Sequence, residues 1–268
     1  MSLDLDERQR AMLAEMGVRV WAPERPAVVM PVAPPTAPAT APERFAPPPQ
    51  PVALVSRVGA VGDLNWADLQ DTVKGCRACG LCEGRQHTVF GAGPTGANGQ
   101  PPRVDWLVVG EAPGEQEDLR GEPFVGQAGK LLDNMLLAIG LKRTESVFIA
   151  NVIKCRPPHN RNPESAEIAQ CSPLLHRQIA LLQPKIILGL GRFSVNTLLA
   201  ATVPDVEKMP LGRLRGQVHR YLPPGEVGGA GIPVVASYHP AYLLRNLPEK
   251  AKSWADLVLA VQTLKDSS

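Results

Sequence analysis

Apolar runs and amphipathic segments alternate along most of the chain, and this alternation restricts the fold more than any other feature. The apolar runs that we interpret as strands are 104–110, 147–152, 185–190 and 233–237. The segments with helical spacing are 64–75, 127–139, 163–182, 191–200 and 248–264. Strands separated by helices form mostly parallel sheets with helices on both faces. The sequence therefore predicts an α/β protein with three layers, α/β/α, around a mostly parallel sheet of four strands.

In such a sheet, ligands bind in the loops at the carboxyl ends of the strands. Three of these loops carry unusual residues: GEAPGEQED after the first run, the segment 151–161 after the second, and Tyr238-His239-Pro240 after the fourth. We expect these three loops to converge on one crevice.

Four cysteines have the spacing of a metal site: Cys76-x2-Cys79, then Cys155, then Cys171. Thiolates at this spacing suit either zinc or an iron-sulfur cluster, and sulfur ligation alone does not separate the two. In a reducing compartment, five cysteines are more typical of metal ligands or free thiols than of disulfides. Cys82 extends the pair to Cys-x2-Cys-x2-Cys, but the fourth cysteine of ferredoxins does not follow three residues later, so Cys82 is treated as a spare thiol. A metal that joins segments so far apart would have a structural role and could also help to position DNA.

The composition of the 268-residue chain sets wider limits. A net charge of +2 does not by itself indicate a nucleic-acid partner. The charged start, MSLDLDERQR, is unlike a secretory signal, and no apolar stretch is long enough to cross a membrane. We therefore expect a cytoplasmic protein with no membrane partner. Its domains are predicted as a short amphipathic segment, 1–21, a Pro/Ala-rich disordered linker, 22–60, and one catalytic domain, 61–268. The N-terminal part is either a tail without function or a tethered peptide that binds a partner.

The loop after the first apolar run combines glycines, acidic residues and an aromatic ring. Gly110 to Gly114 can present backbone amides to a ligand. Glu115, Glu117 and Asp118 either activate a water or form a solvated face. Phe124, in EPFVG, is predicted to be a stacking platform for a planar ring.

The other two loops offer groups that suit a nucleobase. Asn151 is either a turn residue or a reader of the base edge, because its amide can both donate to and accept from uracil. His239 could donate to a carbonyl oxygen of a departing base. Leu243, Leu244 and Arg245 form either core or an apolar wedge with a basic anchor, which would push a nucleotide out of a duplex.

Taken together, GEAPGEQED, EPFVG, ANVIKCRPPHNR, HPAYLLRN and the cysteine spacing resemble the iron-sulfur uracil-DNA glycosylases of bacteria and archaea, called family 4. The resemblance runs from about residue 64 to residue 264. It implies a monofunctional enzyme that flips uracil out of DNA and hydrolyses its N-glycosidic bond, leaving an abasic site for base excision repair.

The resemblance also implies roles for individual residues. The four ligands of a [4Fe-4S] cluster would be Cys76, Cys79, Cys155 and Cys171. The uracil pocket would be formed by Glu111, Ala112, Phe124, Asn151 and His239, with Phe124 stacking on the base and His239 stabilising the anionic leaving group. DNA contacts are expected from Leu243, Leu244, Arg245, Arg161 and Arg215.

Two points depart from what such a family leads us to expect. The loop after the first strand has Glu111 followed by Ala112, so the residue that activates water is not obvious, and Glu117 is our hypothesis for it beside the catalytic candidates Glu111 and His239. His219 lies in an apparent strand rather than in an Arg-rich insertion, which favours turnover over a covalent bond to DNA.

The expected partner is uracil-containing DNA, bound by a monomer at the nucleoid. If the N-terminal tail binds a partner, we expect a replication or repair protein. The alternative is a non-catalytic module that binds uracil-DNA or single-stranded DNA in replication.

Overall fold

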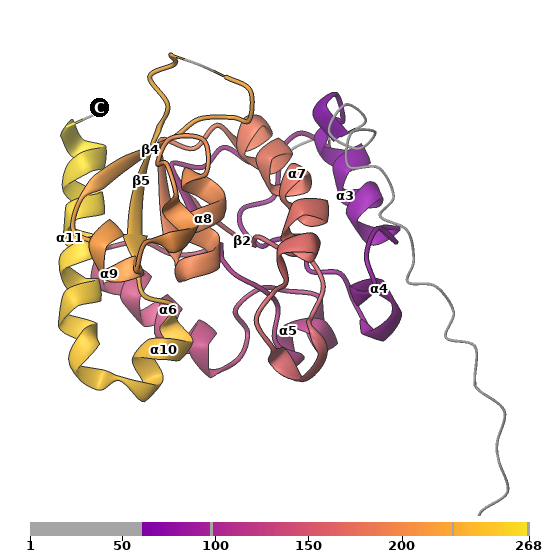
Figure 1. Ribbon diagram of the computed structural model, residues 1–268, viewed down its shortest axis with the longest axis horizontal. Coiled ribbons are helices and arrows are strands. Elements are labelled where there is room, and N and C mark those ends of the chain that lie inside the picture. Colours follow the sequence, from indigo (N-terminus) through magenta and orange to yellow (C-terminus); the bar gives the residue numbers. More distant parts are fainter. Residues whose placement is uncertain (1–60, 97–98, 227, 267–268) are drawn as a thin grey trace, which may run out of the picture. The chain divides into compact units, whose positions relative to one another are not determined.

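The computed structural model describes residues 61–96, 99–226 and 228–266 of the chain (Figure 1). The segment 1–21 and the linker 22–60 that we predicted from composition lie outside the described residues. Among the described residues, no helix combines the length and the apolar character needed to cross a bilayer.

A five-stranded sheet with the order β2-β1-β3-β5-β4 forms the centre of the described region. Its strands are β1 Trp106–Gly110, β2 Val147–Asn151, β3 Ile186–Leu190, β4 Val218–Tyr221 and β5 Ile232–Ser237. Four strands are parallel, and β4 pairs antiparallel with β5 at the edge. The four predicted strands are confirmed, but the predicted count misses β4. This strand buries only Tyr221 fully, so it contains no apolar run that would indicate sheet.

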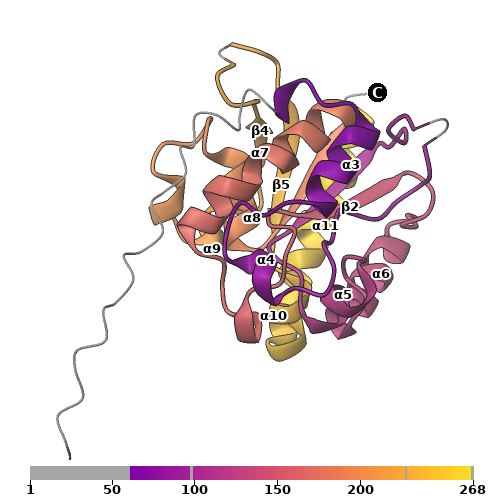
Figure 2. The ribbon, with the colours of Figure 1, turned by 90° about the vertical axis from the view of Figure 1, so that its right-hand side faces the viewer.

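Helices cover both faces of the sheet, which confirms the three layers (Figures 1 and 2). One face packs against α3 Trp66–Lys74, α7 Ser165–Leu182 and α8 Arg192–Leu199. The other packs against α6 Gln127–Ala138 and α11 Lys250–Asp266. Successive side chains of a strand point to opposite faces, so Leu107 joins the first core cluster and Val108 the second. The strands are therefore buried on both sides, as their continuous apolar runs require.

Shorter helices lie in the connections. They are α4 Leu81–Gly84, α5 Glu115–Arg120, α9 Leu211–Leu214, α10 Pro240–Arg245 and the 3-10 turns Pro158–Asn160, Val206–Lys208 and Leu247–Glu249. The sequence predicted a loop where α5 forms. The Glu117 carboxylate accepts the Gly114 N–H at 3.0 Å at the start of this helix, and Gly121 ends it with a left-handed φ of 73°.

Candidate active site and metal centre

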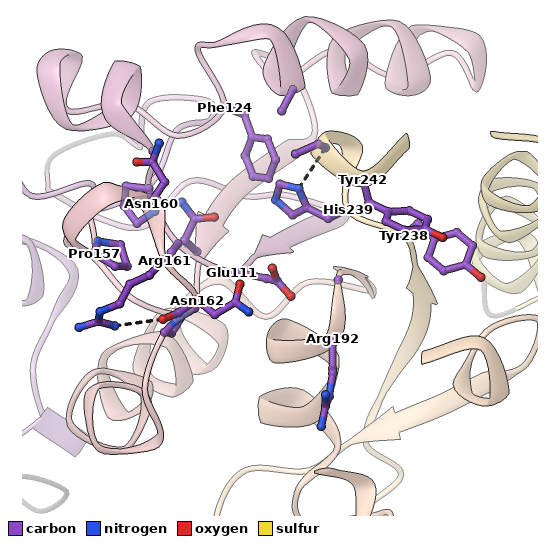
Figure 3. A pocket seen from close by; sticks show the side chains of 18 of the residues that line it. Glu111, Phe124, Pro157, Asn160, Arg161, Asn162, Arg192, Tyr238, His239 and Tyr242 are labelled. Atoms are coloured by element: carbon purple, nitrogen blue, oxygen red, sulfur yellow. Dashed lines mark hydrogen bonds between the residues drawn. The ribbon is translucent and has the colours of Figure 1, made fainter. Parts of the chain in front are cut away.

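A cavity of about 700 Å³ lies at the carboxyl ends of β1, β2, β3 and β5 (Figure 3). The three loops singled out from the sequence all line it. Every pocket residue that the sequence predicted is among its lining residues: Glu111, Ala112, Phe124, Asn151 and His239. The expectation that these loops converge on one crevice is therefore met by the fold.

Asn151 is the last residue of β2 and is only 1% exposed. Its Oδ1 has no hydrogen-bond partner among the described residues, although a buried polar atom without a partner costs on the order of 1–3 kcal/mol. A Cβ at Gly110 would collide with both Oδ1 and the Phe124 ring, so only glycine leaves room there. The amide is thus held at the floor of the pocket with its acceptor kept for a ligand.

Phe124 lies in the connection between α5 and α6, and its side chain is 5% exposed. Its ring is nearly parallel to that of His239, with 5.3 Å between the centroids and 27° between the planes. The backbone has a φ of 55°, in the left-handed region that a bulky residue rarely adopts. Such strained residues persist only where the surrounding structure holds them in place.

His239 precedes α10, and its Nδ1 accepts the backbone N–H of Ala241 at 3.2 Å. This bond fixes the tautomer, because a ring nitrogen that accepts carries no proton and the proton lies on Nε2. Burial, followed by the positive charge of Arg245, lowers the pKa of His239 to about 4. At neutral pH the ring is therefore neutral, with Nε2–H as its donor.

Glu111 follows β1, and its Oε1 accepts the backbone N–H of Phe193 at 2.9 Å, at the amino end of α8. Burial raises the pKa of this carboxyl, and the N–H groups at the start of α8 act in the opposite direction. Gly191 has a φ of 93°, and a Cβ at this position would collide with the Glu111 carboxylate. A half-buried carboxylate is thus held inside the pocket, next to Ala112.

Glu117 also lines the pocket, and its carboxylate is held by backbone groups. Its carboxylate accepts three backbone N–H groups, from Gly114 at 3.0 Å, Val125 at 2.8 Å and Gly126 at 3.0 Å. Its neighbour Asp118 is buried and accepts the N–H groups of residues 86 and 87. These two carboxylates of the acidic run therefore organise the backbone, a role that neither interpretation of the sequence included.

Both arginines predicted to contact phosphate outside the α10 loop are engaged within the protein. Arg215 is 9% exposed, pairs with the buried Asp256 at 2.7 Å and stacks 4.3 Å above the Tyr238 ring. A guanidinium held in this way would have to leave its pair to reach DNA, and the phosphate contact of Arg215 stays a prediction. Arg161 lines the pocket but forms a two-pronged pair with Glu167, at 2.6 and 2.9 Å. Its charge is therefore largely compensated before DNA arrives.

The predicted wedge divides into two parts. Leu243 is 1% exposed and packs inside, so it belongs to the core, as the alternative interpretation held. Leu244 is 42% exposed, and Arg245 lines the pocket. In a single helical turn, neighbouring residues point in different directions, which is why a Leu-Leu pair could not be resolved from the sequence.

The four predicted metal ligands surround one small cavity, and Cys82 lines it too (Figure 2 shows α3 and α4 near α7). Burial raises the pKa of Cys79, Cys155 and Cys171, that of Cys171 to about 12. Thiolates in such a place need compensating positive charge. Iron would supply it, so the donor set fits a cluster. Among the described residues, no group of three or more His, Cys, Asp or Glu side chains could hold a single metal ion, so the fit rests on the shared cavity and on the chemistry of its thiols.

Donors surround the cysteine sulfurs. Arg85 donates to Cys155 Sγ at 3.2 Å, and the backbone N–H of Lys154 donates to Cys171 Sγ at 3.3 Å. The Nζ of Lys154, which is fully buried, donates to the Asn151 carbonyl at 2.8 Å and to Gln178 at 2.6 Å. Lys154 therefore links the cysteine cavity to the floor of the pocket.

Sequence reasoning missed Lys154 and Arg192. Lys154 lies inside ANVIKCRPPHNR, but no local pattern shows that a lysine is buried. Arg192 lines the pocket at the end of β3. The rule on carboxyl ends of strands could have found it, since the loop after the third strand belongs to the same edge.

Residues 97–260 match the model of the uracil DNA glycosylase superfamily. The chain belongs to this superfamily. It is 41% identical over 177 residues to the type-4 uracil-DNA glycosylase of Archaeoglobus fulgidus, which covers 66% of this chain and 82% of the relative. The type-4 enzymes of Saccharolobus solfataricus and Pyrobaculum aerophilum are 42% and 37% identical, over 67% and 73% of this chain and 77% and 93% of theirs. The type-4 resemblance drawn from the motifs is confirmed.

Within this superfamily member, His219 lies in β4 as expected, and its Nε2 donates to the Leu214 carbonyl at 2.8 Å. It is therefore engaged in a structural contact and is not a lining residue of the pocket.

Proposed function

We propose that this chain hydrolyses the N-glycosidic bond of uracil in DNA and leaves an abasic site. The observation that carries the proposal is the buried, unpartnered Oδ1 of Asn151 at the floor of a pocket that also holds Phe124 and a neutral His239. The relatives named type-4 uracil-DNA glycosylases support the same activity.

The pocket suits a base taken out of the helical stack. Asn151 offers an acceptor and a donor, which match the N3–H and O4 of uracil. Cytosine presents the opposite pattern at this edge and would leave Oδ1 facing an acceptor. The Phe124 ring gives the base a face to stack on, a contact worth about 1–3 kcal/mol per base.

In the chemical step, the bond between N1 and C1′ breaks and its electron pair leaves with uracil as an anion. The Nε2–H of His239 donates to the uracil O2, where this charge gathers, and the buried site strengthens that bond. A water adds to C1′ of the cationic sugar and loses a proton. Glu111 is our candidate to hold this water, since each carboxylate oxygen can accept more than one hydrogen bond.

Cys76, Cys79, Cys155 and Cys171 would hold a [4Fe-4S] cluster. Such a cluster would tie α3, the loop after β2 and α7 together and supply positive charge to the buried thiolates. DNA contacts would come from Leu244 and Arg245 at the pocket rim. Recruitment of a replication or repair protein through the N-terminal tail, a monomeric state and a place at the nucleoid remain predictions.

The test is to incubate anaerobically purified protein with an oligonucleotide that contains uracil and to score free uracil and alkali-labile sites. We expect multiple turnovers by the wild type. Asn151→Asp should lose uracil release and gain release of cytosine, because its carboxylate can accept from the cytosine N4 amine. Tight binding without uracil release would overturn the proposal and favour a binding module.

A further inference from the structure

The loop that carries Phe124 is held in place from two sides, by Glu117 of the pocket lining and by two residues outside the pocket. Phe124 keeps its left-handed φ of 55° while its ring forms part of the pocket wall. Nothing in the local sequence EPFVG favours that conformation, because glycine is the residue that adopts it readily. The contacts that hold it must therefore come from elsewhere in the chain.

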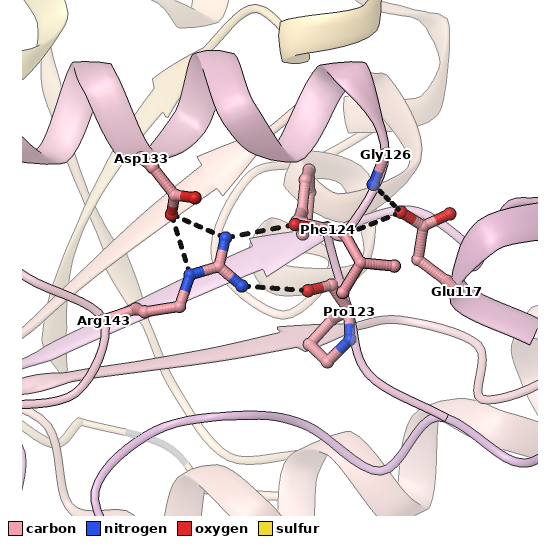
Figure 4. Close-up of polar contacts among 7 residues, drawn as sticks. Glu117, Pro123, Phe124, Gly126, Asp133 and Arg143 are labelled. Atoms are coloured by element: carbon pink, nitrogen blue, oxygen red, sulfur yellow. Dashed lines mark hydrogen bonds and ion pairs between the residues drawn. The ribbon is translucent and has the colours of Figure 1, made fainter. Parts of the chain in front are cut away.

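Arg143 supplies such contacts on the carbonyl side of the loop (Figure 4). Its guanidinium donates to the carbonyls of Pro123 at 3.2 Å and Phe124 at 3.1 Å. The same group pairs with Asp133 of α6, at 2.6 and 2.7 Å. A planar guanidinium has five N–H donors in a rigid fork, which allows it to bridge three acceptors at once. Arg143 therefore anchors the Phe124 backbone to α6.

The opposite side of the loop is held by complementary contacts. Glu117 accepts the N–H groups of Val125 and Gly126, immediately after Phe124. Gly129 packs so closely on the Phe124 carbonyl that a Cβ there would collide with it. The peptide groups around Phe124 are thus held at both their donors and their acceptors. A carboxylate accepts from the N–H groups, and a guanidinium donates to the carbonyls.

We propose that Arg143 and Asp133 are positioning residues that fix the Phe124 ring for the base from outside the pocket. The inference rests on the proposed function, since the base that stacks on Phe124 is uracil. Neither residue is among the described residues that line the pocket, and the Arg143 side chain is 22% exposed. Their effect on catalysis therefore acts through Phe124.

The test is a double-mutant cycle that joins Arg143→Met with Phe124→Ala. In the wild-type background we expect Arg143→Met to lower kcat/KM about tenfold and to raise KM and the inhibition constant for free uracil, because small displacements of a contact residue cost large factors. In the Phe124→Ala background the same change should cost less than about twofold, since the ring that it positions is gone.

Lys142→Met is the matched control, because Lys142 is the adjacent cation and pairs with the exposed Glu145 in a surface bridge. It should leave kcat/KM and uracil inhibition within about twofold of the wild type. Arg143→Lys should be intermediate, since an ammonium keeps the Asp133 pair but cannot bridge both carbonyls. If Arg143→Met does not fold, Arg143→Lys and Asp133→Asn complete the cycle in its place.

An equal loss in both backgrounds would overturn the proposal, as would a fall in kcat with KM and uracil inhibition unchanged, which indicates fewer folded molecules. If the wild type releases no uracil, the proposed function fails instead. Amide hydrogen exchange at Val125 and Gly126 then tests the brace without catalysis. Faster exchange in Arg143→Met than in Lys142→Met supports it, and equal exchange contradicts it.

Discussion

The base pocket and the cysteine cavity both lie at the end of β2, but their polar groups differ in what they require from outside the protein. In the pocket, the ring of His239 is fixed by the N–H of Ala241, and the Oδ1 of Asn151 has no partner among the described residues. In the cysteine cavity, burial raises the pKa of three thiols, so the site needs positive charge before its ligands can ionise. The described residues form the pocket by themselves, whereas we expect the cysteine cavity to be completed by a metal centre.

This difference separates two kinds of damage. A change at His239 should lower activity and leave the fold intact, because the hydrogen bond of its ring is local, to the N–H of Ala241 two residues on. A change at a cysteine should lower stability first, since metal binding energy is folding energy in such sites. Lys154 joins the two regions through Cys171 and Asn151, so the separation is open to experiment.

The largest effect should come from loss of a metal ligand. We expect Cys155→Ser to lose the visible absorbance of an iron-sulfur cluster and to lower Tm by about 10 °C, on a scale of about 2–4 °C per kcal/mol for a domain of this size. Thermal scans and absorbance of anaerobically prepared protein measure both. Cys82→Ser is the control, because Cys82 lines the same cavity but is not a predicted ligand. Equal damage by the two changes would mean that the ligand set is wrong.

Loss of the pocket donor should affect activity alone. His239→Ala removes the Nε2–H that we assign to the leaving uracil, and loss of one such donor costs about 10²–10³ in kcat. Single-turnover release of uracil measures the effect, and Tm should stay close to that of the wild type. A variant that loses stability as strongly as activity would break the distinction between the two regions.

The layers, the four parallel strands and the loops that converge could be predicted because each depends on a local pattern. Continuous apolar runs such as VDWLVVG indicate buried strands, and the topology then brings their carboxyl ends together. The same logic failed for β4, whose residues VHRY bury a single side chain fully at the sheet edge.

Which polar side chain is engaged by the fold could not be predicted, because that depends on partners far away in sequence. The sequence predicts a phosphate contact for Arg215 but not its pair with Asp256, 41 residues on. The contacts of Glu117 could not be predicted either, because its three N–H donors are backbone groups that leave no mark in the sequence. Burial and pairing of charges are tertiary properties.

A smaller effect should distinguish the two interpretations of Glu117. If it only organises the Phe124 loop, Glu117→Gln should lower kcat/KM about tenfold, because the amide oxygen still accepts from Val125 and Gly126, but less strongly than a carboxylate. The KM and the inhibition constant for uracil should rise. A loss of about 10²–10⁴ in kcat with KM unchanged, as expected for a general base, would restore the original hypothesis.

The smallest effect is a dependence on pH between about pH 8 and pH 5, where histidine is the side chain that titrates. The pocket contains a histidine, whereas none of the described residues that line the cysteine cavity is one. Burial lowers the pKa of His239 to about 4 from its ordinary 6.5, and burial does the same to His176, whose ring contacts Tyr221 far from the pocket. Both histidines are neutral in the folded protein, but they bind protons in the unfolded chain below about pH 6.5. Their contribution to the free energy of unfolding is therefore fully present above that pH and is lost as pH drops toward 4.

Activity per folded molecule should change less than about twofold between pH 8 and pH 6, because His239 does not titrate there. Urea unfolding and initial rates across this range measure the two quantities. A loss of kcat/KM as pH rises through about 6.5, absent in His239→Asn, would show instead that the donor is the protonated ring.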